Sequence, residues 1–293
     1  MRTAPFRKGS LLLFVVSFFT LSANAQLLSD SVRIDNHYRT FHFKKPGTST
    51  VSQLIFVLHG SGGNGKDFRQ NALNLEARSD QEQFILVYPD GYKHFWNECR
   101  KAAQTPPNLE NINEEAFFTR MIEYFRDKYK IDESRVFAIG FSGGGHMAYK
   151  LVITMPEKIR AITAIVASLP DSTNMDCIEK KVSRSVMIVN GTLDPLNKWE
   201  GGEIILANNV RMGRMRSAEA SFRYWAQLAG YTGTPRSDRL PDLDTSDGKI
   251  IERYSYSHQG KPEVVLLKVV GGKHDLPNDI DTFQEAWSFF KRQ

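Results

Sequence analysis

The chain has 293 residues, with 38 Lys and Arg against 33 Asp and Glu, a formal net charge of +5 at pH 7. Residues 26–293 hold 35 basic and 33 acidic side chains, because the first 25 residues contain three basic side chains and no acidic one. This near balance argues against a nucleic-acid-binding protein. No stretch after residue 25 reaches the roughly 20 apolar residues of a membrane-spanning helix.

The first 25 residues have the pattern of a secretory signal peptide. Basic side chains precede an apolar run over residues 11–21, and the Ala-Asn-Ala of residues 23–25 is the small-x-small pattern that signal peptidase cleaves. The sequence therefore predicts cleavage after Ala25 and export to the periplasm or out of the cell. It also predicts that residues 26–293 form a single catalytic domain.

Short apolar runs rich in Val, Ile and Phe recur along the chain and predict strands that are covered on both faces. Ahead of them, residues 32–34 and 38–43 predict an antiparallel hairpin at one edge of the same sheet. The apolar runs are residues 54–58, 84–88, 136–139, 161–166, 186–189 and 264–270.

Helical patterns lie between these runs. The clearest is an apolar stripe over residues 117–129, and further helices are predicted over residues 218–228, capped by Ser217, and 280–291. Residues 235–249 are polar and acidic and predict a surface loop. Strands alternating with helices predict a mostly parallel sheet with helices on both faces, an α/β protein.

The two cysteines, Cys99 and Cys177, both lie in the part of the chain that is predicted to be exported, where disulfides persist. We expect a disulfide between them, with two free thiols as the alternative. No cluster of Cys and His has the spacing of metal ligands.

Residues 140–144 read Gly-Phe-Ser-Gly-Gly and fit the Gly-x-Ser-x-Gly pattern, directly after a predicted strand and before a predicted helix. In that context Ser142 is expected on a sharp, strained turn, with its hydroxyl exposed near a helix N-terminus that favours negative charge. The alternative is a glycine-rich turn that only packs or binds phosphate.

Residues 59–65 read His-Gly-Ser-Gly-Gly-Asn-Gly and follow the predicted strand at 54–58. Such a loop can offer a backbone N–H to the oxyanion of a tetrahedral intermediate. We assign one donor of the oxyanion hole to the backbone N–H of Gly143. The other donor is assigned to the N–H of Ser61, with that of Gly62 as the alternative. For His59 we prefer a structural role in holding the turn.

A catalytic acid and base are expected after later strands, in the order Ser, Asp, His. Asp194 follows the strand predicted at 186–189, and the alternative for it is a surface turn. His274 follows the last predicted strand and is the candidate base. Three other histidines are weaker candidates for the base, because none directly follows the last predicted strand. They are His94, His146 and His258.

With these residues in place, the chain resembles a bacterial family of secreted esterases. This family unites polyhydroxybutyrate depolymerase-like proteins with the feruloyl and acetylxylan esterases of carbohydrate esterase family one. The resemblance runs from about residue 38 to the C-terminus. Its motifs are Leu58-His59-Gly60, Tyr88-Pro89-Asp90-Gly91, Trp96-Asn97, Ile131-Asp132, Arg135-Val136, the serine turn, Asn190-Gly191-Thr192-x-Asp194-Pro195, Gly201-Gly202 and Gly272-x-His274.

The resemblance implies an α/β-hydrolase fold, a three-layer sandwich in which Ser142, Asp194 and His274 take the triad roles. It also implies that the loops carrying Trp96 and Trp199 border the substrate cleft, although partial burial in packing is an equal alternative for both.

The sequence departs from the family pattern at several positions. Gly143 stands where the family often has Asn or Ala, and Gly145-His146 stands in place of a methionine-rich continuation. Residues 113–117 differ from the family's Asp-Asp-Val-Gly-Phe. These departures spare the triad.

The expected reaction is two-step acyl transfer without a metal or organic cofactor. No separate adsorption module for a solid polyester is visible, so the preferred substrates are feruloyl or acetyl esters on plant polysaccharide. Three alternatives stay open: a depolymerase of 3-hydroxybutyrate oligomers, a secreted serine peptidase, and an inactive carbohydrate-binding relative. Model esters compared with peptide anilides would separate esterase from peptidase. No nucleic-acid partner is expected.

Overall fold

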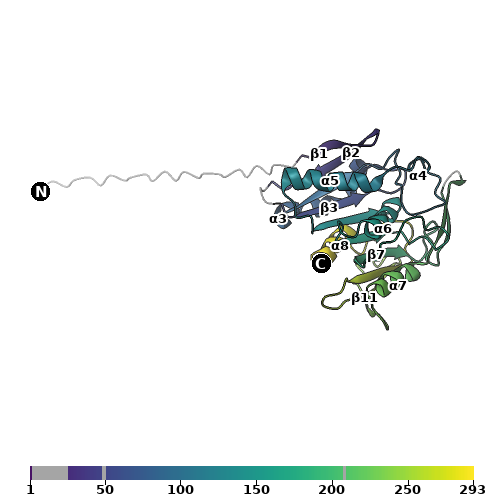
Figure 1. Ribbon diagram of the computed structural model, residues 1–293. Helices are drawn as coiled ribbons and strands as arrows, with labels where there is room; N and C mark the ends of the chain where they lie inside the picture. Colours follow the sequence, from purple (N-terminus) through teal and green to yellow (C-terminus); the bar gives the residue numbers. More distant parts are fainter. Residues whose placement is uncertain (2–25, 48–50, 207–208) are drawn as a thin grey trace.

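The computed structural model describes residue 1 and residues 26–47, 51–206 and 209–293 (Figure 1). The predicted signal peptide, apart from Met1, lies outside the described residues. No helix in the described ranges is long and apolar enough to cross a membrane.

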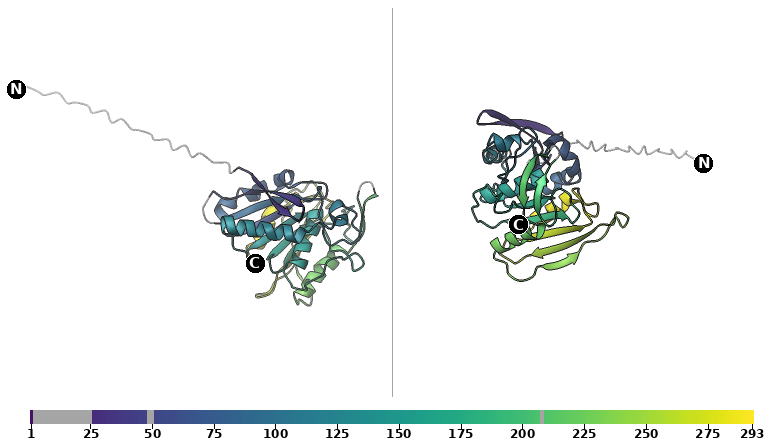
Figure 2. Two further views of the ribbon diagram at one scale, coloured as in Figure 1. Left: turned by 45° about the horizontal axis from the view of Figure 1, so that its top comes forward. Right: turned by 90° about the vertical axis from the view of Figure 1, so that its right-hand side faces the viewer.

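Within the described residues, ten strands form one sheet in the order β1-β2-β4-β3-β5-β6-β7-β12-β11-β10. The central strands from β4 to β12 are parallel, and antiparallel strands complete both edges. In the right-hand view of Figure 2, the purple N-terminal strands and the yellow-green strands lie at opposite ends of the molecule. The strands are β1 (Leu28–Ile34), β2 (His37–Lys44), β3 (Gln53–Leu58), β4 (Phe84–Pro89), β5 (Val136–Phe141), β6 (Ala161–Ile165), β7 (Ser185–Gly191), β10 (Arg236–Arg239), β11 (Ile250–Tyr256) and β12 (Val264–Val270).

Helices cover both faces of the sheet, so the molecule has three layers (Figure 1). One face carries α5 (Glu114–Tyr129), α6 (Gly143–Thr154) and α7 (Ala218–Leu228), and the other carries α8 (Thr282–Phe290). Successive residues of a buried strand point to opposite faces, as where Leu54 and Ile55 of β3 enter separate cores. The predicted mostly parallel α/β sheet is confirmed.

Shorter elements complete the described chain. They are α1 (Gly65–Phe68), η1 (Arg69–Ala72), α2 (Leu73–Glu76), α3 (Ser79–Glu82) and α4 (Pro106–Leu109), and a separate hairpin of β8 (Gly202–Ile205) and β9 (Arg211–Met215).

The prediction of a surface loop over residues 235–249 is wrong in its first part, because β10 lies there and pairs with β11. The sequence of β10 is Arg-Ser-Asp-Arg, and three of its four residues are exposed. An edge strand that buries no apolar face leaves no hydrophobic alternation to recognise.

Side-chain caps set the N-terminal ends of α7 and α8. Ser217 caps α7 by accepting the Ala220 N–H at 3.0 Å, as predicted. Asp281 caps α8 by accepting the N–H groups of Phe283 and Gln284 at 3.1 Å each.

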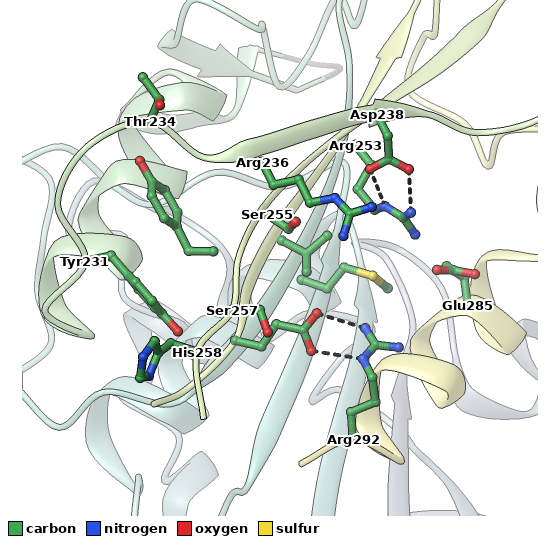
Figure 3. Close-up of a pocket in the computed structure, with 14 residues that line it drawn as sticks. Tyr231, Thr234, Arg236, Asp238, Arg253, Ser255, Ser257, His258, Glu285 and Arg292 are labelled. Carbon is green, nitrogen blue, oxygen red and sulfur yellow. Dashed lines mark hydrogen bonds and ion pairs between the residues drawn. The ribbon is translucent and has the colours of Figure 1, made fainter. Parts of the chain in front are cut away.

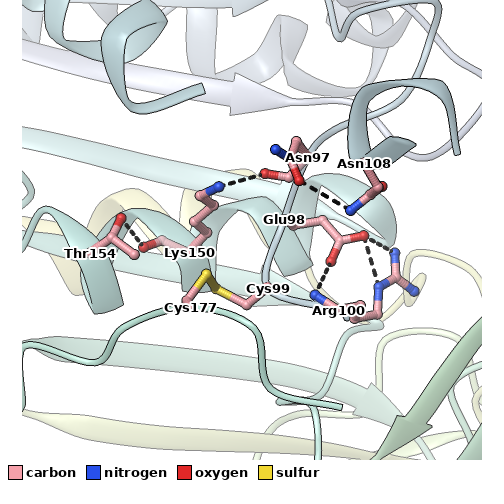
Figure 4. The surroundings of a disulfide bond; sticks show 8 residues. All are labelled: Asn97, Glu98, Cys99, Arg100, Asn108, Lys150, Thr154 and Cys177. Atoms are coloured by element: carbon pink, nitrogen blue, oxygen red, sulfur yellow. Dashed lines mark hydrogen bonds and ion pairs between the residues drawn. A yellow bond between two sulfur atoms is a disulfide. The ribbon is translucent and has the colours of Figure 1, made fainter. Parts of the chain in front are cut away.

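The structure joins Cys99 and Cys177 in a disulfide that ties the loop after β4 to the segment after β6 (Figure 4).

Candidate active site

Ser142 sits in a strained turn between β5 and α6. Its backbone has φ 52° and ψ −116°, a conformation that residues with side chains rarely adopt. The turn requires glycine on both sides: a Cβ on Gly140 would clash with the Gly144 carbonyl, and a Cβ on Gly144 would clash with the Leu58 carbonyl. The close approach of β3, β5 and α6 lifts the serine side chain above the carboxyl edge of the sheet.

Three side chains that are far apart in the sequence meet at this edge. The Nε2 atom of His274 lies 2.9 Å from Ser142 Oγ, and its Nδ1 atom lies 2.7 Å from Asp194 Oδ2. Ser142 follows β5, Asp194 follows β7, and His274 follows β12. Because these strands are parallel, their carboxyl ends lie at one edge, which brings the three predicted residues together.

The carboxylate of Asp194 is fixed from a second direction. Its side chain is fully buried, and Oδ1 accepts the N–H groups of Leu196 and Asn197 at 2.8 Å each. The side-chain amide of Asn197 also donates, through Nδ2, to Ser168 Oγ at 3.2 Å. With Oδ1 occupied, Oδ2 is left to accept the Nδ1–H of His274, which fixes the tautomer of the imidazole.

Asn197 is a residue that the sequence analysis missed. Its place three residues after Asp194 is the spacing at which an aspartate accepts a backbone N–H in a turn, so the signal was present in the sequence.

The glycine-rich loop after β3 abuts the serine turn. A Cβ on Gly143 would lie 3.0 Å from the Ser61 nitrogen, so the two predicted oxyanion donors belong to touching segments. Gly143 is the first residue of α6, where an N–H has no partner within the helix. The Gly62 N–H donates to the His94 carbonyl at 2.8 Å, whereas the Ser61 N–H has no acceptor among the described residues. This geometry favours Ser61 over the alternative Gly62.

His59 and Trp96 connect the loop after β3 with the loop after β4 through hydrogen bonds. His59 is fully buried, its Nε2 accepts the Gly91 N–H at 2.9 Å, and burial lowers its pKa. The Trp96 indole is 2% exposed and donates to the His59 carbonyl at 2.9 Å. The structural role preferred for His59 agrees with these contacts. The expectation that Trp96 borders the cleft is corrected, because its side chain lies in the core.

Trp199 is also largely buried, at 8% exposure, but it borders a hollow of about 290 Å³ on the α7 side of the sheet. Tyr254, Tyr256 and Lys268 line the same hollow. Lys268 Nζ lies 5.6 Å from the centre of the Trp199 ring, a cation–π contact that holds the indole in place.

A hollow of about 380 Å³ lies beside the oxyanion loop and is lined in part by Ser61, Phe68 and Phe141. The Phe141 ring centre is 5.7 Å from that of His274, so this hollow adjoins the triad. The two phenylalanine rings lie 5.9 Å apart and offer an apolar surface beside the nucleophile.

A larger hollow, of about 570 Å³, lies between β10, β11 and α8 and is lined by no member of the triad (Figure 3). Its charges are largely paired within the protein. Arg253 makes two hydrogen bonds to Asp238, and Arg292 makes two to Glu263. Because these opposite charges are paired with each other, they attract a charged ligand only weakly.

The three rival histidines do not reach the serine hydroxyl. The Nδ1 atoms of His94 and His258 lie within hydrogen-bonding distance of the carbonyls of Gly63 and Gln259. That of His146 lies 3.1 Å from the Ser168 carbonyl. Among the described residues, no group of three or more His, Cys, Asp or Glu could hold a metal ion.

A mostly parallel sheet with a serine on a tight strand-to-helix turn, faced by a histidine and a buried aspartate, defines an α/β-hydrolase. Comparison with known families agrees with this class. The chain belongs to the phospholipase/carboxylesterase family, whose family model matches residues 44–204. It is a hydrolase that acts on ester bonds.

Similar proteins include feruloyl and acetylxylan esterases. Feruloyl esterase C of Emericella nidulans is 32% identical over 165 residues, which are 55% of this chain and 55% of that protein. A bifunctional acetylxylan esterase/xylanase of Neocallimastix patriciarum is 24% identical over 182 residues, 62% of this chain and 25% of that protein. The chain thus spans about half the length of the first relative and a quarter of the second.

Among solved structures, the acetyl xylan esterase of Aspergillus awamori matches with a TM-score of 0.61 and 16% identity, over 89% of this chain and 99% of that chain. At 16% identity, this comparison shows a similar fold only.

Proposed function

We propose that the protein is a secreted serine carboxylesterase with Ser142 as nucleophile, His274 as general base and Asp194 as the acid that orients the histidine. The observation that carries the proposal is the continuous series of hydrogen bonds from Ser142 Oγ through the imidazole to the buried carboxylate, at 2.9 Å and 2.7 Å. Both distances lie within the range expected for proton transfer and orientation.

The mechanism follows from the protonation states that these contacts favour. With Nδ1–H donated to Asp194, the Nε2 lone pair of His274 faces Ser142 Oγ and takes its proton as the oxygen attacks the ester carbonyl. The N–H groups of Ser61 and Gly143 stabilise the oxyanion. The imidazolium protonates the leaving alkoxide, and water releases the acyl group by the same route.

For the substrate, we propose feruloyl or acetyl esters carried by plant polysaccharide. The feruloyl and acetylxylan esterases among the relatives support this class. Within the hollow beside His274, the rings of Phe68 and Phe141 give one apolar wall, which suits a small or aromatic acyl group.

Secretion is proposed from the signal-peptide pattern of the first 25 residues. The Cys99–Cys177 disulfide supports it, because such bonds persist in oxidising compartments. Expression of the full chain in a bacterial host, followed by N-terminal sequencing of the exported protein, tests this directly. The expected first residue is Gln26, and an uncleaved protein retained in the cytoplasm would contradict the proposal.

The esterase proposal is tested with Ser142→Ala and a panel of methyl ferulate, p-nitrophenyl acetate, 3-hydroxybutyrate esters and peptide anilides. Loss of the nucleophile is expected to lower kcat by about 10⁴-fold or more on the ester substrates. Ser134→Ala is the matched control, because Ser134 is exposed and bonds only to Asp132 among the described residues. Hydrolysis by Ser142→Ala at the parental rate would refute the assignment.

A further inference from the structure

His146 connects the nucleophile to the loop after β6. It stands one turn after Ser142 on α6, and its backbone N–H donates to the Ser142 carbonyl at 3.0 Å. Its Nδ1 atom lies 3.1 Å from the carbonyl oxygen of Ser168, which can only accept, so Nδ1 carries the hydrogen. Burial holds the pKa of His146 well below its usual value, so the ring is neutral near pH 7.

Ser168 joins this helix to a second strand. It lies three residues after the end of β6 and is fully buried. Its Oγ atom accepts from the side-chain amide of Asn190, near the end of β7, at 3.1 Å and from that of Asn197 at 3.2 Å. Asn190 is fixed in turn, because its Oδ1 accepts the Ala167 N–H at 3.0 Å. The loop after β6 is thereby attached both to β7 and to the turn that follows β7.

Asn197 completes a second connection between the nucleophile and the acid. Its backbone N–H donates to Asp194 Oδ1 at 2.8 Å, while its side chain bonds to Ser168. The first connection is the catalytic one, which passes through His274 at 2.9 Å and 2.7 Å. The second connection avoids that imidazole and runs through His146, Ser168 and Asn197.

The second connection continues the alignment of the strands beyond the end of the sheet. The residue pairing of β5 with β6 and of β6 with β7 ends at Ile165 and Val189. Asp194 lies further along the chain, on a turn whose backbone N–H groups at Thr192 and Leu193 donate toward β12 and the loop after it. Those bonds tie the acid to the histidine loop, whereas the second connection ties it to α6.

The side chains of the second connection contribute little to stability. All three are more than nine-tenths buried, yet Asn197 Oδ1 has no hydrogen-bond partner among the described residues. An unpartnered buried amide oxygen costs at least as much free energy as one hydrogen bond contributes. The Asn197 side chain is therefore better explained by the geometry that it imposes than by the stability that it adds.

We propose that the second connection, through His146, Ser168 and Asn197, positions the catalytic acid relative to the helix that carries the nucleophile. With the two ends of the triad held at a fixed separation, the imidazole of His274 stays in the orientation in which Nε2 takes the serine proton. The inference rests on the proposed triad and adds the residues that position it.

Ser168→Ala and Asn197→Leu test one hydrogen bond from its two ends. Ser168→Ala keeps the carbonyl that His146 contacts, and Asn197→Leu keeps the size of the side chain and the N–H donated to Asp194. Each is expected to lower kcat/KM for p-nitrophenyl acetate by about 10- to 100-fold, the cost of displacing a catalytic group by about 1 Å. Urea titration should show little change in the stability of Asn197→Leu.

His146 is tested by a disruptive and a conservative variant. His146→Leu removes the donor to the Ser168 carbonyl and should lower kcat/KM by a similar factor, whereas His146→Asn, whose side-chain amide can place an N–H near the position of Nδ1, should recover most of it. Thr163→Val is the matched control and should keep the parental kcat/KM. Thr163 is also a fully buried hydroxyl residue of β6, and its Oγ1 has no partner in the described part of the chain.

A double-mutant cycle separates positioning from a general loss of folded protein. In an Asp194→Asn background the imidazole no longer acts as the base, so adding Asn197→Leu should change the residual rate by less than about threefold. A residue that only supports folding would lower the rate by the same factor in both backgrounds.

A folded Ser168→Ala or Asn197→Leu variant within about threefold of the parental kcat/KM would overturn the proposal. Equal losses in the two backgrounds of the cycle would do the same. Because the two variants break one hydrogen bond, either one that folds decides the test. Both negative results leave the esterase proposal standing if Ser142→Ala is inactive, whereas a fully active Asp194→Asn variant would contradict the triad itself.

Discussion

Replacing Asp194 by asparagine tests how the carboxylate controls the histidine. The Oδ1 atom can keep both backbone N–H groups, from Leu196 and Asn197, and the side-chain volume is unchanged. The other terminus becomes an NH₂ group, which only donates, in place of the oxygen that lies 2.7 Å from His274 Nδ1. The imidazole must then present a lone pair at Nδ1 and carry its proton on Nε2.

A protonated Nε2 at 2.9 Å from Ser142 Oγ cannot accept the hydroxyl proton, so the variant loses its general base while keeping its shape. The expected loss in kcat is about 10⁴-fold, equivalent to about 5.4 kcal/mol of transition-state stabilisation.

The assay is steady-state hydrolysis of p-nitrophenyl acetate at pH 7, with circular dichroism to establish that the variant is folded. Asp275→Asn is the control, because Asp275 neighbours His274 in sequence but is 49% exposed and makes only a 3.9 Å ion pair with Lys249 in the described residues. A folded Asp194→Asn variant within tenfold of the parental kcat would refute the role given to the carboxylate.

Three further predictions concern the scaffold. Replacing both Cys99 and Cys177 by serine opens a 78-residue separation and is expected to lower the free energy of unfolding by up to about 4.5 kcal/mol, measured by urea titration. Gly144→Ala forces a methyl group into the backbone of β3, so soluble yield and activity should both fall. Arg39→Leu leaves the fully buried Glu114 without its 2.9 Å partner and should lower the unfolding free energy by about 3–5 kcal/mol, whereas Arg39→Leu with Glu114→Gln should recover much of it.

The central strands could be predicted because burial on both faces leaves continuous apolar runs, as in β3 and β12. The positions of Ser142, Asp194 and His274 followed from the same runs, since each comes directly after a buried strand. The polar edge strand β10 could not be found in this way, because its pairing with β11 depends on backbone hydrogen bonds rather than on a buried face.

The sequence could not tell which aromatic and charged side chains are enclosed. Trp96 follows a recognised motif, yet its burial against His59 depends on how the loops after β3 and β4 pack. Arg100 and Glu98 look like ordinary loop charges two residues apart, and only the fold shows that both are buried and form an ion pair with each other.

The most direct test of the central claim is covalent labelling with a fluorophosphonate, followed by mass spectrometry of the digested protein. Such reagents react with a serine whose hydroxyl is activated by a neighbouring base. The account predicts one adduct per chain, on Ser142, formed in step with the loss of esterase activity. Complete inactivation with Ser142 unmodified, or an adduct on another residue that accounts for the loss, would contradict it.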